Sequence, residues 1–300
     1  LKDKSRVRAF TYGLSKDQSR STEVTRAKAL ANIFGIQWEQ VELGNYHRYL
    51  TNWYTSFGPS THAHGMYQHE FYEKIKCRFQ GQKVALLSGI IGDVWAGSVP
   101  YHDLENPTDL IKLGFSHGLT GDTDQLRVKS ELKARDEFWN ANREKLKDHR
   151  FQTITSMRFK LILLCYLLKV PRSFGFEAWS PFLDIDVAMA MLNLPSERRQ
   201  NRSWQTNFFN KVGLNLESHG LKGSPRNVLS FEAQKADPVP KLDQTILSNY
   251  FDPDYVRWIN KEIGVIWSNE IKTSVLSVPK LGGLLRKVGV QNTHQRAYSA

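Results

Sequence analysis

A short glycine-containing turn holds the residues best suited to chemistry. It reads Ser88-Gly89-Ile90-Ile91-Gly92-Asp93 and follows an apolar run at residues 83–87. Small residues allow a phosphate or a ribose to approach the backbone, and Asp93 offers a carboxylate oxygen of the kind that Mg²⁺ takes from proteins. The alternative is a tight turn in which Asp93 caps the next helix. The spacing alone leaves both interpretations open.

Alternating strand and helix patterns before this turn predict an α/β fold. In chain order they indicate a strand at residues 6–12, a helix at 22–34, a strand at 37–43, a helix pair at 46–57 and 65–79, and a strand at 83–87. Strands separated by helices are typical of a parallel sheet with crossover connections. Ligands of such sheets bind beyond the carboxyl ends of the strands, which is where the turn lies.

The composition changes after Gly97. Residues 124–212 have mainly helical spacing, and the stretch at 151–168 is apolar enough to form a core helix. We therefore expect two parts, an α/β part at residues 1–98 and a mostly helical part at residues 99–300.

Bulk properties restrict the class of protein. The 300 residues are 40% apolar and 24% charged, and the longest apolar stretch, at residues 161–168, is far shorter than the roughly 20 residues that cross a bilayer. The opening residues do not form a signal peptide, so we expect a cytoplasmic protein without membrane contact. Cys77 and Cys165 stand alone and form no disulfide or metal pattern.

The net charge of +11 raises the question of a nucleic-acid partner, because clustered Lys and Arg neutralise phosphates. The basic excess is spread along the chain and is not concentrated in one segment. This distribution favours a generally basic surface over an RNA footprint, and a nucleic-acid partner is not expected.

Two further groups of residues could take part in chemistry. His62, His64 and His69 suggest a metal cluster, because neutral imidazoles bind zinc, but their spacing fits no HExxH site. A helix start with exposed histidines is favoured instead. Asp184 and Asp186 could act as acid and base, yet their apolar neighbours favour a helix cap.

Four short motifs, in order, resemble the synthetase domain of the asparagine synthetase family. Ser88, Gly89, Asp93 and Gly97 match the family pattern S-G-E-G-[SA]-D-E and the glycines that follow it. The family's second strand, its A-x3-A helix and its G-V-E-x-R-x-P-F-L-D segment resemble, in that order, residues 10–13, 27–38 and 175–184. The similarity extends over residues 6–216.

The resemblance implies a fold and a reaction. The fold would be the C-terminal ATP-pyrophosphatase (PP-loop) domain, with a parallel sheet of the adenine-nucleotide alpha-hydrolase (HUP) type. Residues 1–98 would be its nucleotide-binding part, and residues 99–300 would complete the domain. The reaction would activate a small-molecule carboxylate as an acyl-adenylate with release of pyrophosphate, followed by attack of ammonia. ATP and Mg²⁺ are the implied cofactors.

The resemblance also assigns site residues. The implied nucleotide-binding residues are Tyr12, Gly13, Ser88, Gly89 and Gly92. Among these, Ser88 and Gly89 would hold the adenosine part of ATP, and Tyr12 would line the adenine side. Asp93 would be both a catalytic residue and the ligand of Mg²⁺ and pyrophosphate. Arg202 is the only cation near the position of the family's adenylation lysine, and it would stabilise phosphate charge.

The chain departs from the family pattern at several positions. The family's phosphate loop, S-G-G-x-D-S, should precede the strand that contains Phe10, where it cannot fit. We therefore expect truncation, with the first strand and the loop missing, which puts the activity of this segment alone in doubt. Ile90 replaces a glutamate, Val94 replaces an acidic residue, and Trp179 or Ser180 stands near an expected arginine.

These departures concern the amidation chemistry more than nucleotide binding, and they favour a divergent amide-forming enzyme. Neither cysteine is near the start, where the family's glutaminase has its nucleophile. Ammonia from glutamine would therefore require a separate glutaminase domain or subunit. Two alternatives remain open: an RNA-binding relative of the PP-loop tRNA-modifying enzymes, and a catalytically inactive interaction domain.

Overall fold

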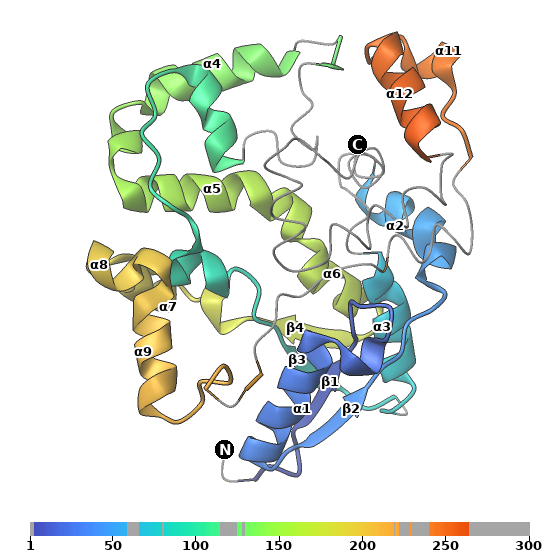
Figure 1. Cartoon of the computed structure of the whole chain (residues 1–300), viewed down its shortest axis with the longest axis vertical. Helices are drawn as coiled ribbons and strands as arrows, with labels where there is room; N and C mark the ends of the chain where they lie inside the picture. The colour runs from blue at the N-terminus through green and yellow to red at the C-terminus, as the bar shows by residue number, and fades with distance from the viewer. Residues whose placement is uncertain are drawn as a thin grey trace. The chain divides into compact units, whose positions relative to one another are not determined.

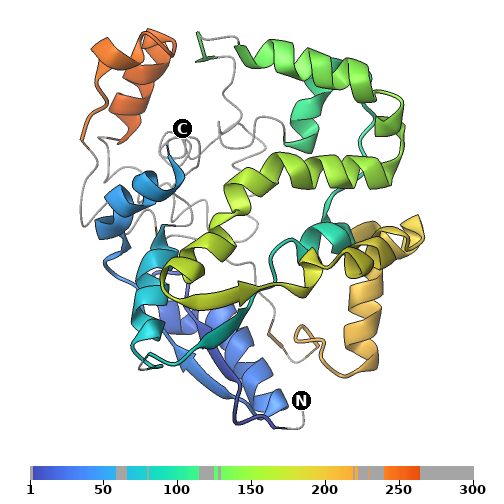
Figure 2. The ribbon, with the colours of Figure 1, turned by 180° about the vertical axis from the view of Figure 1, so that it is seen from behind.

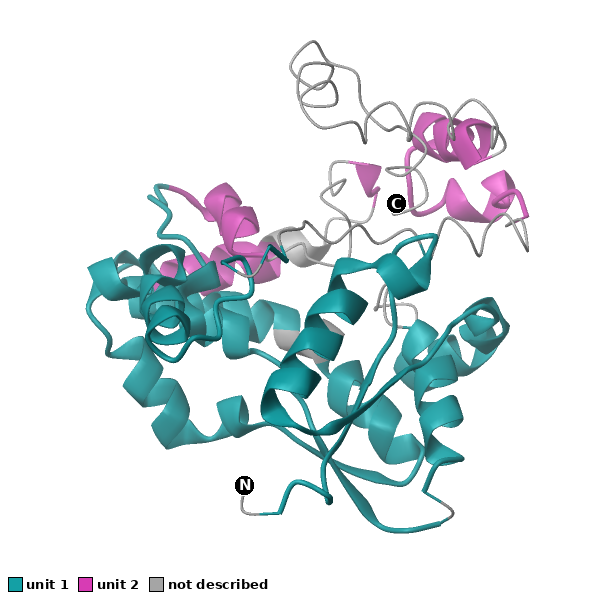
Figure 3. Ribbon diagram, turned by 60° about the horizontal axis from the view of Figure 1, so that its bottom comes forward, with its two compact units in different colours: residues 1–105, 143–233 teal, residues 106–142, 234–300 magenta. Residues whose placement is uncertain are grey.

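The computed structural model describes residues 3–58, 66–79, 81–114, 125–127, 130–218, 220, 221, 229 and 240–263. The chain divides into two units (Figure 3). Unit 1 comprises Leu1–Glu105 and Arg143–Ala233, and unit 2 comprises Asn106–Asn142 and Gln234–Ala300. The turn at residues 88–93 belongs to unit 1.

The first strand, helix and strand form as predicted (Figure 1). β1 (Arg8–Thr11) and β2 (Gln37–Gln40) pair in parallel, and α1 (Thr22–Phe34) connects them. The helix begins after Ser21, whose hydroxyl accepts a hydrogen bond from an amide of the first turn. It ends at Gly35, whose φ of 61° is a left-handed conformation that glycine adopts without steric cost.

A second pair of parallel strands supports the turn. The chain reaches it through η2 (Tyr46–Tyr49), α2 (Leu50–Phe57), α3 (Tyr67–Lys76) and β3 (Val84–Leu87). β3 pairs with β4 (Phe176–Trp179), which places Leu87 opposite Trp179. The mainly helical spacing of residues 124–212 did not predict β4, and there the prediction was wrong. A strand of four residues is too short to show clear alternation, and pairing with a segment distant in sequence specifies it.

One aromatic core packs against both strand pairs. The ring of Phe79 lies 5.8 Å from Phe10 of β1 and 6.0 Å from Phe176 of β4, both edge to face. Tyr72 of α3 lies 5.8 Å from Phe176. The fully buried Trp53 belongs to the same core. In the described residues the two pairs are nevertheless separate two-stranded sheets.

The remaining elements are helical (Figure 2). Unit 1 adds η1 (Gln18–Arg20), η4 (Val94–Ser98), η7 (Lys145–Lys147), α5 (His149–Leu164), α6 (Tyr166–Ser173), η8 (Pro181–Leu183), α7 (Ile185–Leu192), α8 (Ser196–Arg199), η9 (Gln200–Arg202) and α9 (Ser203–Lys211). The predicted apolar helix at residues 151–168 corresponds to α5 and α6, which Cys165 separates. Among the described helices, none combines the length and apolar character needed to cross a membrane.

Unit 2 contains η5 (Pro107–Leu113), α4 (Ser130–Asn142), α11 (Gln244–Leu247) and α12 (Pro253–Ile263). The Asn260 side chain ties α12 to the segment before α11. Its amide oxygen accepts from the Leu242 N–H at 2.7 Å, and its NH₂ group donates to the Leu242 carbonyl at 3.0 Å.

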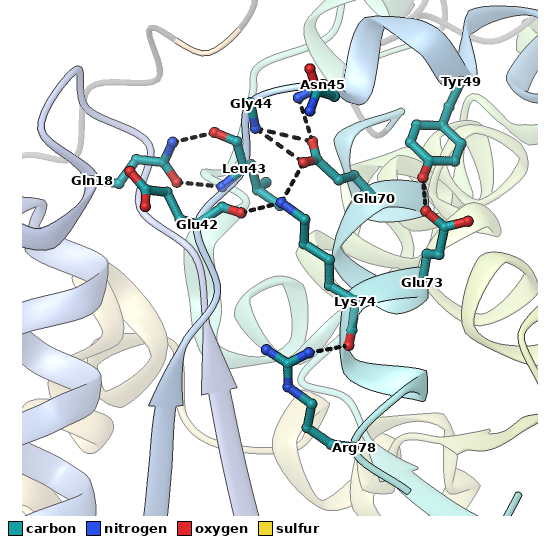
Figure 4. A network of polar contacts seen from close by, with 10 residues as sticks. All are labelled: Gln18, Glu42, Leu43, Gly44, Asn45, Tyr49, Glu70, Glu73, Lys74 and Arg78. Carbon is teal, nitrogen blue, oxygen red and sulfur yellow. Dashed lines mark hydrogen bonds and ion pairs between the residues drawn. The ribbon is translucent and has the colours of Figure 1, made fainter. Parts of the chain in front are cut away.

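A polar network joins the loops that follow β1 and β2 (Figure 4). The side-chain amide of Gln18 accepts from the N–H of Leu43 at 2.9 Å and donates to its carbonyl at 2.5 Å, as a neighbouring strand would. Glu70 of α3 is 2% exposed and accepts backbone N–H bonds from Gly44 at 3.1 Å and from Asn45 at 2.9 Å. These bonds hold both loops against α3.

We expect Glu70→Gln to lower the free energy of unfolding by about 2–3 kcal/mol. Glutamine would place an NH₂ group where Glu70 now accepts N–H bonds and forms an ion pair with Lys74 at 2.6 Å. Urea denaturation measures the change. Glu73→Gln on the same helix is the control, because Glu73 is exposed and its partner, the Tyr49 hydroxyl, lies near the surface, so a loss below about 1 kcal/mol is expected. Equal losses would contradict the role of Glu70.

His69 of α3 is 5% exposed, so the expectation of exposed histidines at this helix start was wrong for it. His62 and His64 lie outside the described residues. The His69 ring stacks on Tyr49 at 5.9 Å and lies 5.8 Å from Trp53. Burial lowers the pKa of His69 below its ordinary value of 6.5. Where the structure describes the chain, no three His, Cys, Asp or Glu side chains gather as metal ligands.

The lowered pKa of His69 predicts a loss of stability on the acid side. Below pH 6.5 the unfolded chain takes up a proton that the buried ring resists, so the free energy of unfolding falls as the pH falls from 6.5 towards the folded-state pKa. We expect His69→Phe, which fits an aromatic environment and does not titrate, to flatten this part of the curve. Urea denaturation at several pH values from 7 downwards measures it; parallel curves for the two proteins would refute the assignment.

Candidate active site

The turn at residues 88–93 and the segment at residues 179–184 lie side by side, because each follows one of two paired parallel strands. The Ser88 N–H donates to the Trp179 carbonyl at 2.8 Å, which extends the ladder between β3 and β4 by one bond. Beyond it, the fully buried Ser180 hydroxyl donates to the Ile90 carbonyl at 3.2 Å. Pairing thus brings together two motifs that are far apart in the sequence.

Internal hydrogen bonds shape the turn itself. The Ser88 hydroxyl accepts from the Ile90 N–H at 3.2 Å, and the Gly92 N–H donates to the Gly89 carbonyl at 3.1 Å. Ile91 has a φ of 58°, a left-handed conformation that is rare for a β-branched residue and costs roughly 1–3 kcal/mol. The isoleucine side chains are buried, whereas Gly89 is exposed, and a Cβ added to it would meet no atom within 4 Å. The backbone at Gly89 is therefore open to a ligand.

Gly92 is a glycine for a packing reason. A Cβ at this position would lie 2.6 Å from the Phe182 ring, so the residue cannot carry a side chain without displacing that ring. Trp95 of η4 fixes the same segment, because its indole N–H donates to the Phe182 carbonyl at 2.8 Å. The motif at residues 181–184 thus supports the turn from one side.

Asp93 directly precedes η4 and is exposed. Among the described residues, its Oδ2 accepts one long hydrogen bond, 3.4 Å, from the Ser98 hydroxyl, and the carboxylate is exposed one residue after the buried part of the turn. Such a site fits Mg²⁺, which keeps several waters and usually takes one or two protein carboxylates. Asp93 is also the N-terminal neighbour of η4, but its side chain makes no capping hydrogen bond there, contrary to the alternative of a helix cap.

Arg202 ends η9, which packs against η4. Its side chain is exposed. Asn201 and Arg202 have φ values of 53° and 58°, two successive left-handed residues that are not glycine. The fold therefore brings a strained, cationic loop next to the helical turn that Asp93 begins.

Tyr12 and Gly13 follow β1 and are less accessible. The Tyr12 ring packs 4.9 Å from Phe71, and burial raises its pKa well above the ordinary value of 10.0. A Cβ on Gly13 would lie 2.2 Å from the Gln18 carbonyl oxygen and 2.6 Å from the Ser21 hydroxyl. Close packing of the following loop explains this glycine, and its contact with a nucleotide stays a prediction.

Two of the departures from the family pattern, Ile90 and Val94, lie at buried positions. Ile90 and Val94 are 5% and 6% exposed and belong to one apolar cluster with Met191 and Leu192 of α7. An acidic side chain at either position would lose hydration without a partner. The apolar replacements are therefore consistent with their surroundings.

Two residues that sequence reasoning missed also shape the site. The Arg199 carbonyl oxygen approaches Gly97 so closely that a Cβ there would lie 2.1 Å away. His149 at the start of α5 contacts the Arg199 side chain, with Nδ1 2.9 Å from Nη2. No local sequence signal marks them, because their contacts join segments that are far apart in the sequence.

A sequence model of the family described as asparagine synthase matches residues 1–211. No curated protein and no solved structure matches the chain. The matched range includes both motif turns, the strands that carry them and Arg202.

Proposed function

The chain belongs to the asparagine synthase family, a family of ATP-dependent amide-forming ligases, and from this premise we propose that it joins a small-molecule carboxylate to ammonia. In the first step a carboxylate oxygen attacks the α-phosphorus of ATP, and the bond to pyrophosphate breaks. In the second step ammonia attacks the acyl carbon of the adenylate, AMP leaves with the bonding electrons, and the amide forms with loss of a proton.

One observation supports the proposal above the others: β3 and β4 bring the turn at residues 88–93 and the segment at 179–184 to the same end of a parallel strand pair. In open α/β sheets, ligands bind beyond the carboxyl ends of strands. The exposed backbone of Gly89 and its neighbour Ser88 would contact the adenosine, and the nucleotide would extend towards Asp93.

Charge stabilisation is the main task that we assign to side chains of this site. Asp93 would hold Mg²⁺, which when bound neutralises negative charge on the phosphates. Arg202 would donate N–H hydrogen bonds to the departing pyrophosphate. Unlike the family's lysine, an arginine would not transfer a proton to it. The remaining predicted contacts, from Tyr12, Gly13 and Gly92, would be made through backbone or ring edges, because their surroundings are packed.

The connections between strands support a HUP-type sheet. α1 contacts β1 and β2, whereas the aromatic core beneath α3 covers the side of β1 that carries Phe10. We infer that the two crossover helices lie on opposite faces. A right-handed connection on one face of a sheet places the next strand on one side, and a right-handed connection on the other face places it on the opposite side. We therefore infer that β2 and β3 lie on opposite sides of β1. We propose that one further parallel strand lies between β1 and β3. This would be the family's first strand, which carries the phosphate loop.

Further parts of the proposal concern partners and organisation. We propose residues 1–98 as the nucleotide-binding part and residues 99–300 as the part that completes the synthetase domain. Ammonia would come from a separate glutaminase domain or subunit. A cytoplasmic location remains a prediction from the sequence.

The proposal is tested with the full-length polypeptide. Calorimetric titration with Mg-ATP should show saturable binding. Incubation with a panel of amino acids and other carboxylic acids, in the presence of ammonium chloride, should then yield AMP and pyrophosphate in equal amounts with at least one substrate. Absence of Mg-ATP binding, or formation of ADP and phosphate instead, would contradict the proposal.

A further inference from the structure

Two segments form the junction on which the proposed site depends. One is η4 with Val99, which follows Asp93, and the other is residues 199–204, which contain Arg202. The Trp204 indole N–H donates to the Ala96 carbonyl at 3.1 Å, and the Arg199 carbonyl lies against Gly97. These contacts hold the two backbones side by side. The direction in which the loop at Arg202 points depends in addition on the contacts of the Arg199 side chain.

The Arg199 side chain is buried, at 3% exposure. Its Nη1 donates to the Leu192 carbonyl at 3.0 Å, and its Nη2 lies 2.9 Å from Nδ1 of His149. Within the described residues no carboxylate lies at ion-pair distance from it; the Asp148 carboxylate interacts with its charge from further away, and its buried Nε has no hydrogen-bond partner. A buried guanidinium without a bound carboxylate is costly, so a purely packing role would be served better by an apolar residue.

The His149 ring connects Arg199 to the other segment. A guanidinium has only donors, so Nδ1 of His149 must accept, and Nε2 carries the proton that is donated to the Val99 carbonyl at 3.0 Å. One neutral tautomer therefore bridges the end of η4 and the residue that precedes η9.

Backbone strain collects around this bridge. In the described part of the chain, the residues other than glycine with positive φ are Ile91, Asn201 and Arg202. All three lie at the junction: Ile91 precedes η4, and Asn201 and Arg202 are the second and third residues after Arg199. Strained conformations persist only where surrounding contacts over-determine them, and here the anchored side chains of Arg199 and Trp204 stand on either side of the two strained residues.

We propose that Arg199 and His149 are positioning residues, which hold the loop of Arg202 against the turn of Asp93 so that both reach one polyphosphate. This inference rests on the proposed function. Arg199 does not itself contact the ligand. It fixes the position of the Arg202 backbone, from which the exposed Arg202 side chain extends.

The test compares two substitutions at one position in the full-length polypeptide. His149→Leu removes the acceptor for Arg199, whereas His149→Asn places an amide oxygen close to the position of Nδ1. Calorimetric titration with Mg-ATP should show about tenfold weaker binding for the leucine variant and recovery of most of that loss in the asparagine variant. Arg202→Met should weaken binding of the original protein, but should weaken it much less when combined with His149→Leu, because the two changes remove the same contact.

Thermal denaturation of every variant separates positioning from stability. If His149→Leu lowers the melting temperature but binds Mg-ATP with unchanged affinity below that temperature, the bridge is structural only and the inference is overturned. Additive effects of His149→Leu and Arg202→Met would overturn it as well. Failure of the original protein to bind Mg-ATP would instead overturn the proposed function, and the inference with it.

Discussion

Asp93→Asn is expected to lower kcat/KM for Mg²⁺-dependent pyrophosphate release at least about a hundredfold. The amide keeps the size and the hydrogen bond from Ser98 but removes the negative charge that the metal requires. Because Asp93 is exposed and makes no capping bond, the protein should remain folded. Pyrophosphate release at saturating and at limiting Mg²⁺ measures the effect, and part of it should be recovered as the Mg²⁺ concentration rises.

Asp186→Asn is the matched control for this experiment. Asp186 is an exposed aspartate in the first turn of α7, outside the turn at residues 88–93. Its substitution should leave kcat/KM for pyrophosphate release unchanged within about twofold. Unaltered turnover in Asp93→Asn would show that the carboxylate has no role in the chemistry, whatever the family relationship.

Gly97→Ala is expected to lower the free energy of unfolding by about 2–4 kcal/mol. A methyl group at this position would lie 2.1 Å from the Arg199 carbonyl oxygen, and the φ of 101° is unfavourable for any residue with a Cβ. The backbones of η4 and η9 would have to separate, which should weaken Mg-ATP binding as well. Urea denaturation measures the first effect and calorimetric titration the second.

Gly89→Ala is the comparison for Gly97→Ala, because it adds the same methyl group to another glycine of the same motif. Its Cβ would meet no atom within 4 Å, so the free energy of unfolding should change by less than about 0.5 kcal/mol. The methyl group would nevertheless occupy space that the proposal assigns to the nucleotide, and Mg-ATP affinity should fall. A variant with normal stability and normal affinity would argue against ligand contact at Gly89.

Local signals made part of the fold predictable. Ser21 and Gly35 mark both ends of α1, and the structure has the helix at the predicted residues. The family resemblance, stated for residues 6–216 on four short motifs, agrees with the family match to residues 1–211. Strand β4 was missed, because its four residues owe their conformation to β3 and not to their own pattern.

The packing around the candidate site was not predictable from the sequence. The three glycines of the site look alike in the sequence. The space beside the Cα atom of Gly89 is open, whereas Phe182 fills it at Gly92 and the Arg199 carbonyl fills it at Gly97. Which residue fills the space beside a glycine depends on tertiary contacts, and these have no local signature. For the same reason His69 was expected at the surface, although Tyr49 and Trp53 enclose it.

The outer face of the β3–β4 pair ends in Leu87 and Trp179, which are 69% and 57% exposed and lie opposite one another. Two large, exposed apolar side chains at neighbouring positions favour aggregation. Solubility and yield during expression should therefore respond to these two positions more than catalysis does. Polar substitutions there would reduce aggregation of the protein at high concentration.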